Sequence, residues 1–203
     1  RVATDLRGLR APQTAERARG DLVGILVAGG VGAIGHALLE PLAHEMGATA
    51  IGAGLGLLTT SVALGSIGLA RAPVARLASP AAGALAGAGL AAGALPGGAP
   101  IALALAALVW SGVTERDAFE IAVLAALPLH ATTLVRSLDE SALSAASFDP
   151  RAAVASAIAG ALGAALALVG LRKLAAAGSI AATALYTGTL GFALLGHAYV
   201  AAP

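Results

Sequence analysis

Three residues that could bind a metal ion recur at intervals of four: His36, Glu40 and His44. On a continuous helix this spacing places their side chains on one face, and imidazole and carboxylate groups are ligands of divalent cations. Pro41 lies inside the run, which stands at the exit of an apolar stretch. The spacing therefore predicts either a cation site or a solvated, acidic helix end.

A second candidate site is the turn at Pro96, Gly97 and Gly98, in the middle of a stretch without charged residues that runs from residue 81 to residue 113. Glycines allow backbone N–H groups to approach a phosphate, and a helix that begins near Ile101 would point the positive end of its dipole at the turn. However, residues 80–110 contain no lysine, arginine, serine or threonine. The turn is therefore either an anion site built from backbone groups or a purely structural turn.

His130 is the third candidate, because it follows Pro128 inside an apolar stretch that is long enough to span a membrane. An ionisable group inside a membrane is a functional candidate by default. The alternative is a neutral imidazole that bonds to a helix carbonyl group.

The composition is that of an integral membrane protein. Hydrophobic residues make up 58% of the chain and charged residues 11%, against about 25% charged residues in soluble domains. Disulfides and thiolate metal sites are excluded because there is no cysteine. A net charge of +1 and the lack of any nucleic-acid-binding motif argue against a nucleic-acid partner. We expect one integral membrane domain over residues 22–203, preceded by a basic cytoplasmic arm over residues 1–21.

The expected fold class is all-α, a polytopic membrane protein with about five transmembrane helices and one re-entrant helical hairpin. A helix needs about 20 residues to cross the hydrocarbon core, and each arm of the hairpin over residues 81–113 is too short to do so. Four glycines in the first arm have the spacing of helix-packing motifs: Gly83, Gly87, Gly89 and Gly93. The five expected spans are Leu22–Leu39, Ala48–Ala70, Ala118–Val135, Ala152–Leu171 and Ser179–Val200.

The distribution of basic residues predicts the orientation in the membrane. If the hairpin returns to the side from which it enters, ten basic residues lie on one side and two on the other, as the positive-inside rule requires. We therefore expect a multi-pass protein of the cell membrane, with the N-terminal arm in the cytoplasm. The inner residues are Arg1, Arg7, Arg10, Arg17, Arg19, Arg71, Arg76, Arg116, Arg172 and Lys173, and the outer ones are Arg136 and Arg151.

Two local predictions concern polar side chains within helices. Thr114 and Asp117 have the spacing of a capping box, and Arg116 and Glu120 have that of an ion pair one turn apart. Three hydroxyl groups in the second span can bond back to carbonyl groups of their own helix and then need no other partner. They belong to Thr59, Thr60 and Ser61.

From Gly112 the chain reads GVTERDAFEIAVLAALP, which resembles a stretch of the undecaprenyl-diphosphate phosphatase family of the bacitracin-resistance type. In that family the stretch follows the second signature, PGxSRSG. The corresponding residues here, Pro96 to Ile101, keep the proline–glycine pair and lack the serine–arginine–serine. The order of the helices before the hairpin, the polar break at residues 136–151 and the two closing helices also follow the family. The resemblance covers Asp21 to Val200.

The resemblance implies a hydrolase that converts a polyprenyl diphosphate to the monophosphate within the membrane, with a divalent cation such as Mg or Ca. It also implies inverted repeats, each with a re-entrant hairpin, and a homodimer. The family's first signature, with paired glutamates and a serine-rich turn ending in histidine, would lie before Arg1. The sequence has no initiator methionine, and we expect it to be a trimmed, processed or partial chain.

Three functions follow from these observations. The first is a polyprenyl-diphosphate phosphatase whose first signature lies upstream of Arg1. The second is a non-catalytic relative that binds or translocates polyprenyl-phosphate lipids of the cell envelope. The third is an unrelated small membrane transporter or helix-packing subunit. For this chain taken alone, the lack of serine–arginine–serine favours the second.

Overall fold

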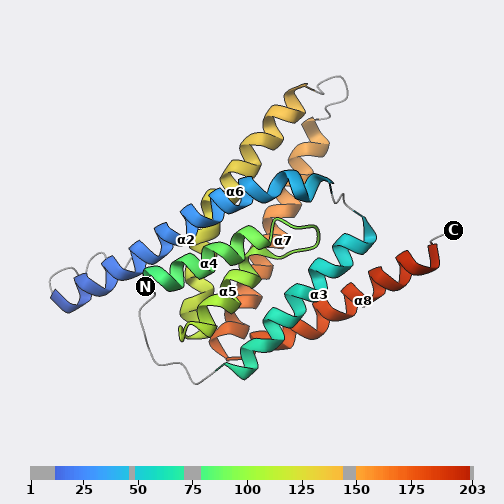
Figure 1. Cartoon of the computed structure of the whole chain (residues 1–203). Coiled ribbons are helices and arrows are strands. Elements are labelled where there is room, and N and C mark those ends of the chain that lie inside the picture. Colours follow the sequence, from blue (N-terminus) through green and yellow to red (C-terminus); the bar gives the residue numbers. More distant parts are fainter. Residues whose placement is uncertain (1–11, 46–48, 71–78, 144–149, 202–203) are drawn as a thin grey trace.

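The computed structural model describes residues 12–45, 49–70, 79–143 and 150–201, and the side chains of residues 19–43, 49–70, 79–133, 135 and 154–200. The described residues form helices joined by turns and contain no strand, which confirms the all-α expectation (Figure 1). The α-helices are α2 (Pro12–Glu45), α3 (Ala50–Ser66), α4 (Pro80–Ala92), α5 (Pro100–Trp110), α6 (Glu115–Leu143), α7 (Pro150–Ala176) and α8 (Thr183–Ala201). Two short 3-10 helices, η1 (Ile67–Leu69) and η3 (Ile180–Ala182), adjoin α3 and α8.

In the described part of the chain, four helical segments are long and apolar enough to cross a membrane, so the chain is a polytopic membrane protein. These segments are Arg19–Ala43, Ala50–Leu69, Val154–Ala176 and Ile180–Val200, and each matches an expected span. The fifth expected span, residues 118–135, lies within α6, which stays helical through Pro128 but is not among the four.

The central stretch forms a helical hairpin, as expected, with arms of 13 residues in α4 and 11 residues in α5. Its turn closes through hydrogen bonds from Ala94 N to Ala91 O (2.9 Å) and from Gly98 N to Leu95 O (2.8 Å). The helices therefore end at Ala92 and begin again at Pro100. Because glycines have no side chain, α4 and α5 approach closely where Gly89 meets the backbone of Leu103.

The hairpin returns to the end of the bundle from which it starts. At the end of α5, Trp110 Nε1 donates a hydrogen bond of 2.9 Å to Ser66 Oγ at the end of α3. The chain leaves α3 at that same end to begin α4. We call this end, with Ser66 and Trp110, the base of the hairpin.

Glycine contacts join the other helices in pairs. In the α2–α4 pair, Gly83 lies against Gly24, and Gly35 lies against Ala91, so these two helices run parallel. In the α3–α8 pair, Gly54 lies against Leu195, and Gly65 faces Ala184, so these run antiparallel. The expectation that the four glycines of the first arm pack helices is confirmed: Gly83 and Gly87 meet α2, Gly89 meets α5, and Gly93, just after α4, meets Pro100 at the start of α5.

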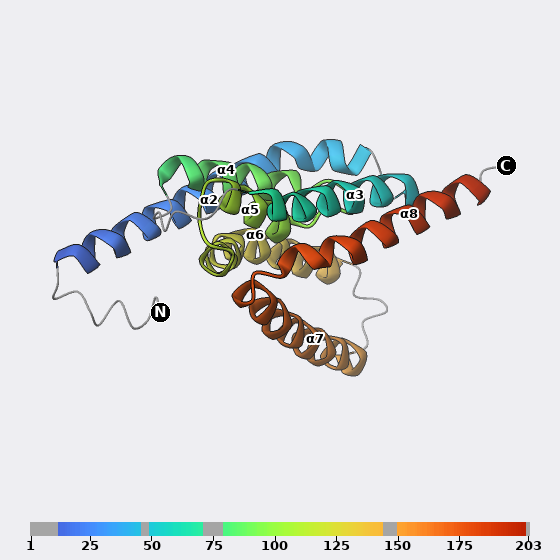
Figure 2. The same cartoon turned by 90° about the horizontal axis from the view of Figure 1, so that it is seen from below.

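Helix α7 stands apart from the other helices (Figure 2). Every residue from Val154 to Gly170 is exposed. The buried contacts of this region begin at Ala175, in the last turn of α7, and continue at Ile180. The protein core lies elsewhere, around the hairpin, where Leu90, Leu105 and Leu108 are the largest fully buried apolar side chains.

Candidate functional site

The hairpin turn lies against the half of α3 that is nearer to its start. A Cβ atom on Gly97 would collide with the backbone of Ala53, and one on Gly56 would collide with the backbone of Pro96. Gly97 also has a φ of +72°, a left-handed conformation that favours glycine. Two glycines on opposite sides of the contact thus allow the turn to rest directly on α3.

Thr60 provides the polar contact between α3 and the turn. Its side chain is fully buried, and its Oγ1 accepts a hydrogen bond of 3.3 Å from Ala99 N. Ser61 Oγ donates to Ala184 O of α8 over 2.7 Å. The expectation of purely local bonding is confirmed for Thr59, whose hydroxyl bonds to Leu55 O. It is wrong for Thr60 and Ser61, because these two positions face neighbouring segments.

The N-terminus of α5 opens onto the turn and has no side-chain cap. Its N-cap residue is Ala99, which has no capping oxygen, and Pro100 has no N–H. The amides of Ile101 and Ala102 therefore belong to the first helical turn, where N–H groups have no partner within the helix. Both residues are only partly buried. The first turn of α5 thus places the positive end of a helix dipole, and two N–H groups without a partner in the helix, beside the hairpin turn.

The N–H groups that could bind an anion at the turn are not all those that the sequence predicted. The amide of Gly98 is used within the turn, and that of Ala99 is used by Thr60. The donors left over are the amide of Gly97 and those of the first residues of α5. Pro96, Gly97 and Gly98 shape the turn, and a catalytic role for them stays a prediction.

His36 is half-buried on α2, and its Nδ1 atom is fully buried. Among the described side chains this is the one buried nitrogen or oxygen atom without a hydrogen-bond partner. Buried polar atoms almost always have a partner, so this atom is chemically unusual. The sequence singled out His36 through its spacing to Glu40 and His44, and gave no sign that Nδ1 would be buried.

The metal site predicted at His36, Glu40 and His44 is not tested, because the side chain of His44 lies outside the described residues. Helix α2 continues through Pro41 to Glu45. On such a helix the first and last of the three residues are about 12 Å apart along the axis. One ion could therefore engage a neighbouring pair, such as His36 and Glu40, rather than all three.

His130 lies in α6 with an exposed side chain. It therefore faces the surroundings of the bundle and is not packed in its core. The two interpretations of His130, functional group or neutral imidazole on a helix carbonyl, both stay open.

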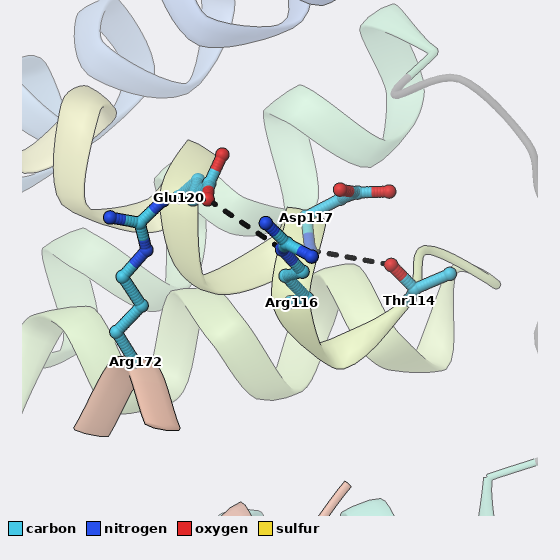
Figure 3. Close-up of polar contacts among 5 residues, drawn as sticks. All are labelled: Thr114, Arg116, Asp117, Glu120 and Arg172. Carbon is cyan, nitrogen blue, oxygen red and sulfur yellow. Dashed lines mark hydrogen bonds and ion pairs between the residues drawn. The ribbon is translucent and has the colours of Figure 1, made fainter. Parts of the chain in front are cut away.

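A charged cluster joins α6 to α7 at the base of the hairpin (Figure 3). Glu120 Oε1 is 3.1 Å from Arg172 Nη2 and 3.9 Å from Arg116 Nε, which confirms the pair one helical turn apart. Thr114 Oγ1 accepts from Asp117 N over 3.3 Å, which confirms Thr114 as the helix cap. The sequence missed Arg172 as a partner, since it is 52 residues away. The cluster lies at the opposite end of α5 from the turn.

Glu115 adds a second link at this end of the molecule. Its Oε2 accepts a hydrogen bond of 3.3 Å from Ile180 N, at the start of η3. The charged cluster and this bond hold the end of α7 and the start of α8 against α6. We assign these contacts a structural role.

Comparison with protein-family models, curated proteins and solved structures finds no match to this chain.

Proposed function

We propose that this chain binds the phosphate group of a polyprenyl-phosphate lipid at the hairpin turn. The observation that carries the proposal is the uncapped N-terminus of α5, which faces a turn held against a membrane-length helix. Helix N-termini favour anions through their free N–H groups and their dipole. Broken helices whose N-termini meet anionic substrate groups are a known solution in membrane proteins.

The same features favour binding over hydrolysis. Hydrolysis of a diphosphate needs a metal, a nucleophile or cationic groups that stabilise the developing charge. Residues 80–110 supply no such side chain, and the hydroxyl of Thr60 is buried and already accepts a bond from the turn. A phosphatase reaction would require residues of the kind found in the family's first signature. We therefore place hydrolysis second.

The placement of charge supports a location in the cell membrane with the base of the hairpin in the cytoplasm. Arg19 lies at the start of the membrane-length segment of α2, and Arg116 and Arg172 lie at the base. The positive-inside rule assigns such an end to the cytoplasmic side. The turn then lies towards the outer leaflet, where it can meet the headgroup of a lipid.

The test is binding of a polyprenyl phosphate, and of the polyprenol of equal length, to purified protein in lipid nanodiscs. We expect saturable binding of the phosphate lipid and at least tenfold weaker binding of the alcohol. An Ala99→Asp variant should lose this binding, because a carboxylate at the N-cap takes up the free N–H groups and repels the phosphate. Thr114→Asp is the matched control, since it adds the same charge at the cap of α6.

Two outcomes would contradict the proposal. One is equal binding of the phosphate lipid and the alcohol by the wild-type protein. The other is unchanged binding by Ala99→Asp. Release of phosphate from a polyprenyl diphosphate in the presence of Mg or Ca would instead establish the phosphatase.

A further inference from the structure

The hairpin turn lies well inside the ends of the membrane-length helices. The turn meets Gly56 of α3, and the last turn of α4 meets Gly35 of α2. Gly56 lies six residues inside the segment that begins at Ala50, and Gly35 lies eight residues inside the segment that ends at Ala43. Along the helix axes these separations are about 9–12 Å. Non-helical backbone is therefore located at a depth that belongs to the hydrocarbon region.

The backbone of the turn is neither fully paired nor covered by the described part of the chain. Among the described residues, the amides of Gly97, Ile101 and Ala102 have no hydrogen-bond partner. Every residue from Ala94 to Leu103 is partly exposed. Membrane proteins tolerate non-helical backbone at this depth only where protein buries it or where it lines a water-filled cavity. Because the described chain leaves the turn partly exposed, water is the partner that the free amides require.

The face of α2 that packs against α4 becomes polar beyond the end of the hairpin. Gly32 lies against Leu90, and His36 and Glu40 follow on the same face at intervals of four residues. Helix α4 ends at Ala92, so this face of α2 extends past the hairpin at Glu40. Both polar side chains are partly exposed, and ionisable groups within membrane segments almost always face the bundle interior or a water-filled cavity. Polar groups of α2 therefore line the space beyond the turn.

The core of the protein closes the opposite approach to the turn. Leu90, Leu105 and Leu108 are fully buried, and they lie between the turn and the base of the hairpin. Water that reaches the turn must therefore come from the side of the membrane opposite the base.

We propose that the hairpin turn is the floor of a water-filled recess, which opens to the side of the membrane opposite the base of the hairpin. Helices α2 and α3 form two of its walls, since both contact the hairpin at the level of the turn. The recess admits water and small hydrophilic solutes to the free amides. The inference goes beyond the proposed function, because it holds whether or not the turn binds a lipid phosphate.

The experiment measures the reaction of single cysteines with a maleimide that does not cross membranes, in a chain without cysteine of its own. Ala94→Cys and Leu95→Cys place the thiol in the turn. The matched controls are Ile34→Cys and Leu55→Cys, at the same depth, where both native side chains are exposed on the surface of the bundle. A thiol reacts as the thiolate, which apolar surroundings disfavour. From the side opposite the base, we expect the turn positions to react at least about tenfold faster than the controls.

Three results would overturn the proposal. If neither turn position reacts from either side, lipid or a second copy of the chain covers the turn. Reaction from the side of the base alone would show that the recess opens the other way. Equally fast reaction of the two controls would show that this level lies outside the hydrocarbon, where the turn needs no recess.

A second measurement covers the case in which the cysteine variants do not fold. In wild-type protein in nanodiscs, hydrogen–deuterium exchange is followed by nuclear magnetic resonance. The amides of Gly97, Ile101 and Ala102 should exchange at least about tenfold faster than that of Leu55, which lies inside α3 at the same depth. Equal protection of all four amides would show that water does not reach the turn.

Discussion

The buried hydroxyl group of Thr60 links α3 to the hairpin turn. It is the fully buried polar side chain among the described residues, and it accepts the hydrogen bond from Ala99 N. Thr59 is its immediate neighbour and points outwards, with its hydroxyl bonded to Leu55 O of its own helix. Substitution of Thr60 should therefore weaken the contact between α3 and the turn, whereas the same substitution of Thr59 should not.

We predict that Thr60→Val destabilises the protein by about 1–3 kcal/mol, because it leaves the partly buried N–H of Ala99 without an acceptor. Thr59→Val should change the free energy of unfolding by less than about 0.5 kcal/mol. Thermal unfolding in a single detergent, followed by circular dichroism, measures both. Equal effects of the two substitutions would show that the bond to the turn does not hold the hairpin.

The sequence could not distinguish these two threonines. Both lie in an apolar helix, and a hydroxyl in such a helix can always bond to a carbonyl of the preceding turn. Which threonine faces a neighbour depends on the rotation of α3 against the hairpin and α8. That rotation is set by contacts between residues far apart in the chain, such as Ser61 with Ala184.

At the scale of the elements, the hairpin is held by close approach of backbones. A methyl group at Gly56 would overlap the turn at Pro96, whereas Gly30 of α2 has no neighbouring atom within 4 Å of a Cβ position. Glycine is thus required at the first position for steric reasons and is replaceable at the second.

We predict that Gly56→Ala destabilises the protein by about 1–3 kcal/mol, as overpacked sites do. Gly30→Ala should be neutral or stabilise the helix by up to about 1 kcal/mol. The measurement is the midpoint of thermal unfolding, together with the lipid binding described above. A neutral Gly56→Ala variant would mean that the turn can move away from α3 at little cost.

The elements themselves could largely be predicted from the sequence. Apolar length identified four of the spans, and the turn at Pro96, Gly97 and Gly98 between two short apolar arms identified the hairpin. The spacing of glycines predicted that the first arm of the hairpin packs against other helices. The partners of these glycines could not be predicted, because Gly83 and Gly89 look alike in sequence although one faces α2 and the other α5.

At the scale of the whole molecule, the hairpin decides the number of crossings. The bond between Trp110 and Ser66 returns α5 to the end of α3. An indole at the boundary between apolar and polar surroundings is also typical of membrane interfaces. The hairpin therefore begins and ends at the same end of the bundle, which favours re-entry over a crossing.

We predict that cysteines introduced at Arg19 and Ser179 both react from the cytoplasmic side, and that one at Thr49 reacts from outside. The chain has no cysteine of its own, so each variant carries a single reactive thiol. The measurement is labelling of intact cells, and of cells made permeable, with a maleimide that does not cross membranes. Reaction of the Arg19 and Ser179 positions from opposite sides would show that the hairpin region crosses the membrane.

The candidate site could be predicted only in outline. The sequence located the turn and His36 but assigned them to two separate sites, because 60 residues separate Pro96 from His36 in the chain. The parallel packing of α2 on α4 brings them to the same level. This packing arises from Gly24 and Gly35 meeting Gly83 and Ala91, and a pattern within one helix cannot reveal such a pairing.

Because α7 is exposed from Val154 to Gly170, substitutions in α7 should be tolerated for different reasons than substitutions in the packed helices. Where α3 and α8 pack on each other, as at Gly54 and Leu195, the fit of the side chain decides whether a substitution is tolerated. Along α7 the side chains face away from the rest of the described chain, so an apolar substitution there should not disturb the packing of the bundle. Leu162 and Gly163 could therefore exchange for many apolar residues without altering the fold, whereas a charge there would act on insertion into the membrane.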